Sequence, residues 1–170
     1  MTARQERRPV AAPETNPEAE APAAPRAART RWRSVRKVAT VYAVVALGSV
    51  IGGVLRALAS VAMLQQLGPG FPWGTLFVNV TGSFAIGFYA ALTGPDGRLF
   101  AGTLQRQFVM AGICGGYTTF SVFSLETFHL VRADNLPAAG LNVGVSVVAW
   151  LAAVWLGHGL ATRLNRLKGS

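Results

Sequence analysis

The sequence GICGGYTTFSVFSLE occupies residues 112–126 and does not resemble an ordinary membrane helix. It lies in an apolar region long enough to cross a bilayer, yet Gly112, Gly115 and Gly116 are followed at once by two threonines. Glycine and β-branched residues support a helix poorly, so the stretch predicts a break in a membrane-spanning helix. Such a break is tolerated only where it is buried in protein or lines a cavity, because freed backbone groups need partners. Carbonyl and hydroxyl groups freed at that depth are typical of ion-binding sites.

The composition is that of a small membrane protein. The chain has 170 residues, enough for one domain or a small bundle, and 51% of them are hydrophobic while 14% are charged. A net charge of +9 raises the question of nucleic-acid binding. Because the basic residues lie in a tail and in loops, with almost none on a helix face, we expect no nucleic-acid partner. The single cysteine, Cys114, excludes an intramolecular disulfide.

Four apolar segments are long enough to cross a membrane. They run approximately over residues 38–63, 74–93, 104–131 and 137–161. Residues 1–37 are interpreted as a disordered, basic tail rich in alanine and proline, and residues 163–170 as a short basic tail. The sequence therefore predicts an all-α membrane protein with four transmembrane helices in residues 38–162 and a break in the third helix.

Lysine and arginine flank these segments unevenly. They cluster before the first segment, between the second and third, and after the fourth. By the positive-inside rule, both termini are expected in the cytoplasm. The imbalance also predicts one fixed orientation in the membrane, since a chain that inserts both ways needs nearly balanced flanking charge.

Two polar side chains inside the apolar segments need an explanation, because polar groups in hydrocarbon require partners. Asn79 either joins two helices through a hydrogen bond or lines a pore as a donor. Arg56 either extends to the lipid headgroups or provides a fixed positive charge at a water-filled entrance, where it would attract anions. The residue pattern alone leaves both choices open.

Each of the four apolar segments contains a short motif of its own. The motifs are GGVLRALAS from Gly52, GTLFVNVTGSFAIG from Gly74, GICGGYTTFSVFSLE from Gly112 and, more weakly, GLNVGVS from Gly140. In this order they resemble the small bacterial fluoride channels of the Fluc/CrcB family, and the third motif is the most specific. The resemblance covers approximately residues 40–162 and omits the N-terminal tail.

This resemblance implies a passive fluoride channel built from two four-helix subunits in opposite membrane orientations. The third helix of each subunit is expected to break at the membrane centre. A structural sodium ion on the dimer axis would be held by backbone carbonyls that match Gly115 and Thr118. Two phenylalanines that line the fluoride path with their ring edges match Phe120 and Phe123.

The same resemblance assigns further residues to the fluoride pathway. The pore asparagine matches Asn79 and the vestibule arginine matches Arg56. Hydroxyl groups along the path match Thr119, Ser121 and Ser146. Asn142 stands where many members have tyrosine.

The chemistry of these residues agrees with such a role. An aromatic ring has a positive edge, which can meet a small anion without a formal charge. Amide and hydroxyl donors replace the hydrogen bonds that an ion loses on dehydration.

Fluoride enters cells as neutral hydrogen fluoride and dissociates inside, so an inside-negative potential would drive the trapped anion out through a channel in the bacterial plasma membrane. No nucleophile, phosphate loop or paired carboxylate is evident, and we expect no enzyme.

Two other functions remain as alternatives. A small proton-coupled exporter needs an acid embedded in the membrane. Asp96 and Asp134 fall in loops, and only Glu126 lies within an apolar segment, near its end. The other alternative is a membrane protein that transports nothing and is recruited to a partner by its basic tail.

The second subunit of a channel is either a copy of this chain or a related chain. A fixed orientation would require a related chain with the opposite charge bias, and therefore a paired heterodimer. Insertion in both orientations would instead permit a homodimer.

Overall fold

The computed structural model describes residues 26–95 and 97–167, with side chains from residue 32 onward. The chain divides into two units, residues 1–35 and 36–170, and the packing described below belongs to the second. The predictions for residues 1–25 and 168–170 lie outside the described residues. α1 begins at Arg26, so residues 26–37, assigned to the tail from the sequence, are helical where they are described, in keeping with the high helix propensity of alanine and arginine.

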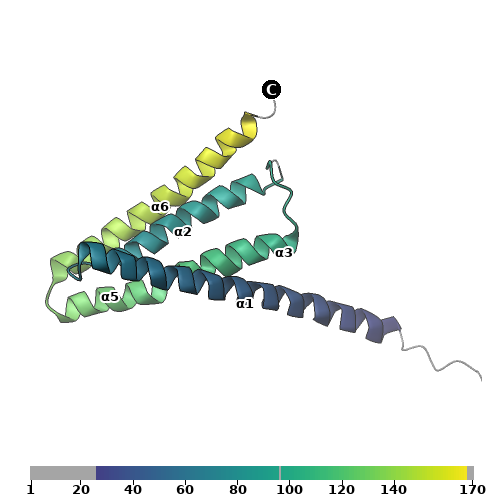
Figure 1. Cartoon of the computed structure of the whole chain (residues 1–170), viewed down its shortest axis with the longest axis horizontal. Coiled ribbons are helices and arrows are strands. Elements are labelled where there is room, and N and C mark those ends of the chain that lie inside the picture. Colours follow the sequence, from purple (N-terminus) through teal and green to yellow (C-terminus); the bar gives the residue numbers. More distant parts are fainter. Residues whose placement is uncertain (1–25, 96, 168–170) are drawn as a thin grey trace, which may run out of the picture. The chain divides into compact units, whose positions relative to one another are not determined.

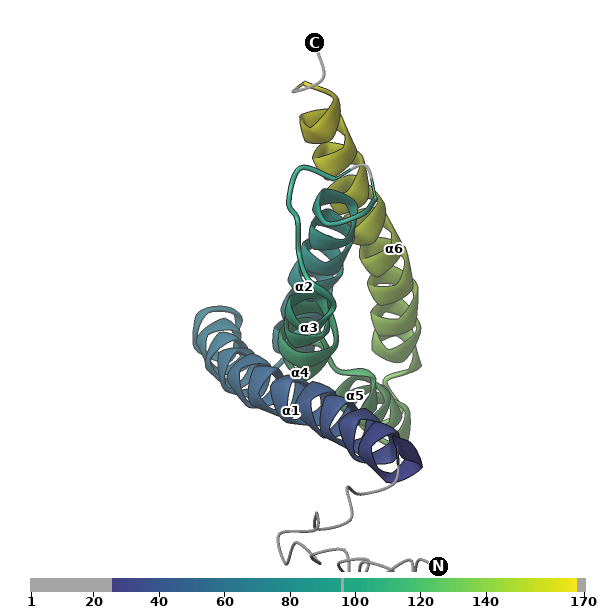
Figure 2. The same ribbon diagram turned by 90° about the vertical axis from the view of Figure 1, so that its right-hand side faces the viewer.

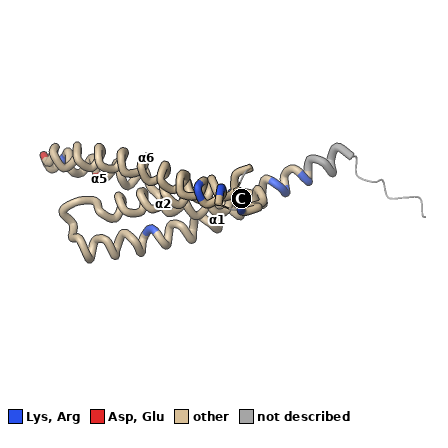
Figure 3. The backbone as a smooth tube through the Cα atoms, turned by 90° about the horizontal axis from the view of Figure 1, so that it is seen from above, with Lys and Arg blue, Asp and Glu red and all other residues tan. Residues whose placement is uncertain are grey.

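The described part of the chain is helical, as Figure 1 shows. In chain order the elements are α1 (Arg26–Leu67), α2 (Trp73–Leu92), α3 (Thr103–Arg106), the π-helical segment η1 (Gln107–Cys114), α4 (Gly115–Tyr117), α5 (Phe120–Arg132) and α6 (Leu136–Arg166). Four stretches are long and apolar enough to cross a membrane: residues 32–67, 73–92, 103–132 and 136–166. The prediction of an all-α protein with four membrane-spanning stretches is confirmed. Figure 3 shows long helical stretches without charge, although Arg56 lies within α1 and not at its end.

α2 and α6 pack side by side along most of their length, as Figures 1 and 2 both show. Two glycines make this approach possible. A Cβ atom on Gly87 would lie 3.0 Å from a methyl carbon of Val154, and one on Gly157 would lie 3.0 Å from the backbone nitrogen of Phe88. Small residues at helix contacts allow backbones to approach closely in membranes, where packing rather than the hydrophobic effect drives association.

α1 packs against η1 and α4 through a second set of glycines. A Cβ atom on Gly48 would lie 2.8 Å from the Cα atom of Gly112, and one on Gly116 would lie 2.7 Å from the Cα atom of Ser49. Gly115 has an ordinary right-handed helical backbone, with φ −64° and ψ −36°. From the sequence, Gly112, Gly115 and Gly116 are expected to weaken the third membrane-spanning helix and favour a break in it. In the structure they are helical, and Gly112 and Gly116 provide room for α1.

Gly52 and Gly53 are adjacent in the chain, but only Gly52 is packed against another helix. The two glycines therefore form a matched pair for mutation. A Cβ atom on Gly52 would lie 2.7 Å from the backbone nitrogen of Tyr117, whereas one on Gly53 would meet nothing within 4 Å. We predict that Gly52→Ala destabilises the folded chain by about 1–3 kcal/mol, because backbone atoms cannot move aside easily. Gly53→Ala should leave stability unchanged or slightly raised, since alanine favours helices. Thermal unfolding in detergent measures both, and equal midpoints for the two variants would contradict the packing.

Candidate functional site

Two residues with extended backbone separate α4 from α5. Thr118 has φ −82° and ψ 159°, and Thr119 has φ −151° and ψ 126°. β-branched side chains favour such conformations over the helix. Thr118 is also anchored by its own hydroxyl group, which donates to the carbonyl of Cys114 at 3.0 Å. The third membrane-spanning stretch therefore contains a short extended segment, Thr118–Thr119, between helical parts.

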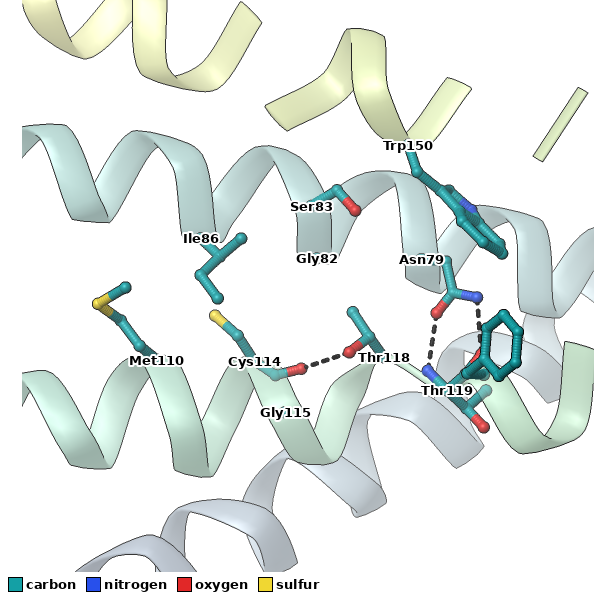
Figure 4. A pocket seen from close by; sticks show the side chains of 11 residues that line it. Asn79, Gly82, Ser83, Ile86, Met110, Cys114, Gly115, Thr118, Thr119 and Trp150 are labelled. Carbon is teal, nitrogen blue, oxygen red and sulfur yellow. Dashed lines mark hydrogen bonds between the residues drawn. The ribbon is translucent and has the colours of Figure 1, made fainter. Parts of the chain in front are cut away.

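Asn79 on α2 holds the extended segment through two hydrogen bonds. Its Nδ2 donates to the carbonyl of Thr119 at 2.8 Å, and its Oδ1 accepts from the backbone N–H of Thr119 at 2.7 Å. Figure 4 shows both bonds. The amide group of Asn79 is buried, and only one of its two N–H hydrogens is used in this pair. Asn79 thus joins two helical stretches and keeps a second hydrogen for another acceptor.

The extended segment redirects two N–H groups that a continuous helix would use internally. In such a helix the N–H of Thr119 would bond to the carbonyl of Gly115, and the N–H of Val122 to the carbonyl of Thr118. Here the N–H of Thr119 bonds to Asn79, and that of Val122 bonds to Oγ1 of Thr119 at 3.2 Å. Both carbonyls are thereby released from these helical partners.

Released carbonyl oxygens are suitable ligands for an alkali cation, which proteins commonly bind through rings of backbone oxygens. Gly115 and Thr118 are the two residues that the sequence resemblance assigns to a sodium ion. Within the described residues, no group of three or more His, Cys, Asp or Glu side chains could hold a metal ion instead. Backbone carbonyls of this kind suit an alkali cation better than a transition metal, which prefers nitrogen and sulfur ligands.

A cavity of about 280 Å³ lies beside the extended segment. Five of the residues that the resemblance assigns to fluoride or sodium line it: Asn79, Gly115, Thr118, Thr119 and Phe120. Gly82, Ser83, Ile86, Met110, Cys114 and Trp150 complete the lining, and no lining residue carries a formal charge. Figure 4 shows how α2, η1, α4 and α6 contribute these side chains.

Aromatic rings continue from this cavity toward α6. The ring centroids of Phe120 and Phe123 are 5.6 Å apart, and Phe123 meets Trp150 edge-on at 4.9 Å. Phe123 is buried, whereas 71% of the surface of Phe120 is exposed. Trp150 is not among the site residues predicted from the sequence, and its buried Nε1 has no hydrogen-bond partner among the described residues. A tryptophan in an apolar span, which needs a partner for its N–H, was the available signal.

Four of the predicted pathway residues do not line this cavity: Phe123, described above, and Ser121, Ser146 and Arg56. Ser121 contacts Oγ1 of Thr119 through its own hydroxyl, at 3.3 Å. Ser146 is fully buried on α6 and donates to Oδ1 of Asn142 at 3.5 Å. Asn142 in turn donates to Oγ1 of Thr127 at 2.9 Å, so this polar group links α6 to α5. Arg56 is half-buried on α1, away from the cavity lining.

Glu126 lines a different cavity, of about 440 Å³, together with Thr75 and His129. One of its carboxylate oxygens, Oε2, is buried without a hydrogen-bond partner among the described residues. Glu126 is therefore separate from the site around Asn79.

The fold and the site define a multi-pass membrane protein with an uncharged polar cavity beside an extended segment. Residues 43–158 match the family model described as CrcB-like protein, Camphor Resistance (CrcB). The chain belongs to this family, also called Fluc/CrcB.

Several curated relatives carry names that specify an ion. The chain is 68% identical over 136 residues to "Fluoride-specific ion channel FluC 1" of Rhodopseudomonas palustris, covering 80% of this chain and 96% of that protein. It is 58% identical over 140 residues to the protein of the same name from Bradyrhizobium diazoefficiens, covering 82% and 94%. A FluC protein of Opitutus terrae is 53% identical over 131 residues, covering 77% and 99%.

The two-bond contact between Asn79 and Thr119 can be tested directly. We predict that Asn79→Ala costs about 1–3 kcal/mol, because the peptide group of Thr119 loses both partners in a buried position. Amide hydrogen exchange at Thr119 should become faster, and thermal unfolding should occur at a lower temperature. Ser83→Ala, which changes a residue of the same cavity, is the matched control. Slow exchange at Thr119 in the Asn79→Ala variant would show that the contact does not hold the segment.

Proposed function

We propose that this chain is a subunit of a fluoride-selective channel that exports fluoride passively. The observation that carries the proposal is the cavity at the extended segment, in a chain 68% identical to a protein named as a fluoride-specific ion channel. There the unused amide hydrogen of Asn79, the hydroxyl group of Thr119 and the ring of Phe120 come together without any charged residue.

An uncharged site is suited to conduction of a small anion. Amide and hydroxyl donors replace part of the hydration shell of fluoride, and the positive edges of Phe120 and Phe123 add a weak attraction. A fixed positive charge would bind the ion more tightly and slow its release, whereas conduction requires that the ion can leave. In this proposal Ser121 and Ser146 supply further hydroxyl groups along the path, and Arg56 attracts anions to a vestibule.

The proposal includes a structural sodium ion and a second subunit. The carbonyls of Gly115 and Thr118 would contribute ligands, and their release from helical hydrogen bonds supports this assignment. Two oxygens are too few to enclose an alkali cation, which is usually surrounded by several. A second subunit in the opposite orientation would supply matching carbonyls, so the break in the third span, the cation and the dimer depend on one another.

The physiological role in this proposal is fluoride resistance. Hydrogen fluoride crosses the bacterial plasma membrane as a neutral acid and dissociates in the cytoplasm. An inside-negative membrane potential favours exit of the anion through a channel by about 2.3 kcal/mol per 100 mV, so no energy coupling is needed. A proton-coupled exporter would instead place its acid at the transported ion, whereas Glu126 lies outside the cavity that Asn79 lines.

Fluoride efflux from liposomes tests this function. We predict that the purified chain, with its partner if one is needed, releases fluoride when the potential is collapsed with an ionophore. Phe120→Ile and Asn79→Asp should each lower the efflux rate by at least about tenfold, equivalent to 1.4 kcal/mol or more. Phe128→Ile changes an exposed phenylalanine on the same helix and should leave efflux unchanged. Efflux that is insensitive to both site substitutions would contradict the proposed pathway.

The orientation of the chain decides the identity of its partner. We propose that it inserts with both termini in the cytoplasm, because basic residues flank that side in excess, and that it pairs with a related chain of opposite charge bias. A C-terminal tag in cells that express this chain alone should then be labelled only from the cytoplasmic side. Equal labelling from both sides would establish insertion in both orientations, and a homodimer would suffice.

A further inference from the structure

A third hollow, of about 670 Å³, lies away from the proposed fluoride pathway. It forms where the end of α2, the loop that follows, the start of the third spanning stretch and the last turns of α6 meet. Its polar lining consists of Arg106, His158, Thr162, Asn165 and Arg166. The residues of this lining belong neither to the cavity beside Asn79 nor to the one beside Glu126.

Hydrogen bonds fix the walls of this hollow. The side chain of Asn165 donates to the carbonyl of Ala91 at 2.9 Å and accepts from the backbone N–H of Arg98 at 3.2 Å. The guanidinium group of Arg98 donates to the carbonyl of Leu164 at 3.2 Å. These hydrogen bonds hold the loop after α2 against the end of α6, so the walls of the hollow are fixed by the fold.

Two arginines of the lining are available to a ligand. The side chains of Arg106 and Arg166 make no hydrogen bond or ion pair with another residue of the described ranges, 26–95 and 97–167. Asp96, the acidic residue of this loop, lies outside those ranges. A guanidinium group presents a planar fork of donors that matches a phosphate, so two of them around one hollow favour a phosphate-bearing ligand.

The position of the hollow favours a lipid over a dissolved anion. The second spanning stretch ends at Leu92, the third begins at Thr103 and the fourth ends at Arg166, so the hollow lies where three stretches reach the membrane boundary. Between Gly97 and Arg106, two residues of its lining, the chain carries Phe100, which is fully exposed, and Leu99 and Leu104, which are about half exposed. Exposed apolar side chains at this depth can pack against acyl chains while the arginines contact the headgroup.

We propose that this hollow binds the phosphate of an anionic phospholipid, such as phosphatidylglycerol or cardiolipin, through Arg106 and Arg166. The bound lipid would hold the loop after α2 and the end of α6 at the headgroup level. The inference rests on the membrane-spanning fold and does not require fluoride transport. Figure 3 shows basic residues gathered at the C-terminal end of α6.

Native mass spectrometry of the purified full-length chain in detergent tests the proposal. We expect one bound phosphatidylglycerol or cardiolipin to be retained in preference to phosphatidylcholine. Arg166→Gln alters an exposed residue, and Arg106→Gln alters a half-buried one. Each should weaken binding of the anionic lipid about fivefold, the effect of roughly 1 kcal/mol per basic residue at a membrane surface. Size-exclusion profiles report whether each variant remains folded.

Arg163→Gln is the matched control, since Arg163 is an exposed arginine on α6 that lines a different hollow. It should leave lipid binding unchanged. An equal loss in this variant would indicate general attraction to basic residues and would overturn the proposal. Binding of inorganic phosphate alone with the same dependence on Arg106 and Arg166, and without preference among lipids, would also overturn it. Fluoride efflux is not a readout here, so failure of the lipid site and failure of the channel function remain distinguishable.

Discussion

The arrangement around the candidate site depends on how one peptide group is satisfied in a membrane. A backbone group that leaves a helix in hydrocarbon must find another partner, because water is not available. The peptide of Thr119 finds it in the side-chain amide of Asn79, which offers one donor and one acceptor to it at once. This pair lets α5 begin immediately after the extended residues, with Thr119 itself as the cap.

Close backbone packing holds the third spanning stretch on both sides of that pair. α1 approaches η1 and α4 through Gly48, Gly52, Gly112 and Gly116, where any side chain would collide with backbone atoms. On the other side, Gly82 of α2 faces the side chain of Thr118, which a Cβ atom at Gly82 would overlap. With little room to move, the extended segment keeps the carbonyls of Gly115 and Thr118 in a fixed place. A shared ion site between two subunits would need such rigidity.

The local pattern predicted more of the fold than of the site. The number and approximate limits of the four spans follow from apolar length, which is a local property. The sequence also indicated weak helix formers between residues 112 and 119, but the pattern could not separate their roles. Glycine both weakens a helix and permits close contact, and only the position of α1 shows that Gly112 and Gly116 serve packing. The extended backbone is confined to Thr118 and Thr119.

By itself, the sequence determined that this chain is a four-span membrane protein with uncharged polar residues within its apolar stretches. The tertiary structure decided which partner each polar group meets. Asn79 and Thr119 are 40 residues apart in the chain, and Asn165 lies 74 residues from Ala91, so no local periodicity reports these contacts. Trp150 is a similar case. Its sequence context predicts an apolar helix, but only the packing of α6 against α5 shows that its ring contacts Phe123. Hydropathy depends on residue type, whereas satisfaction of a buried donor or acceptor depends on what the fold places opposite it.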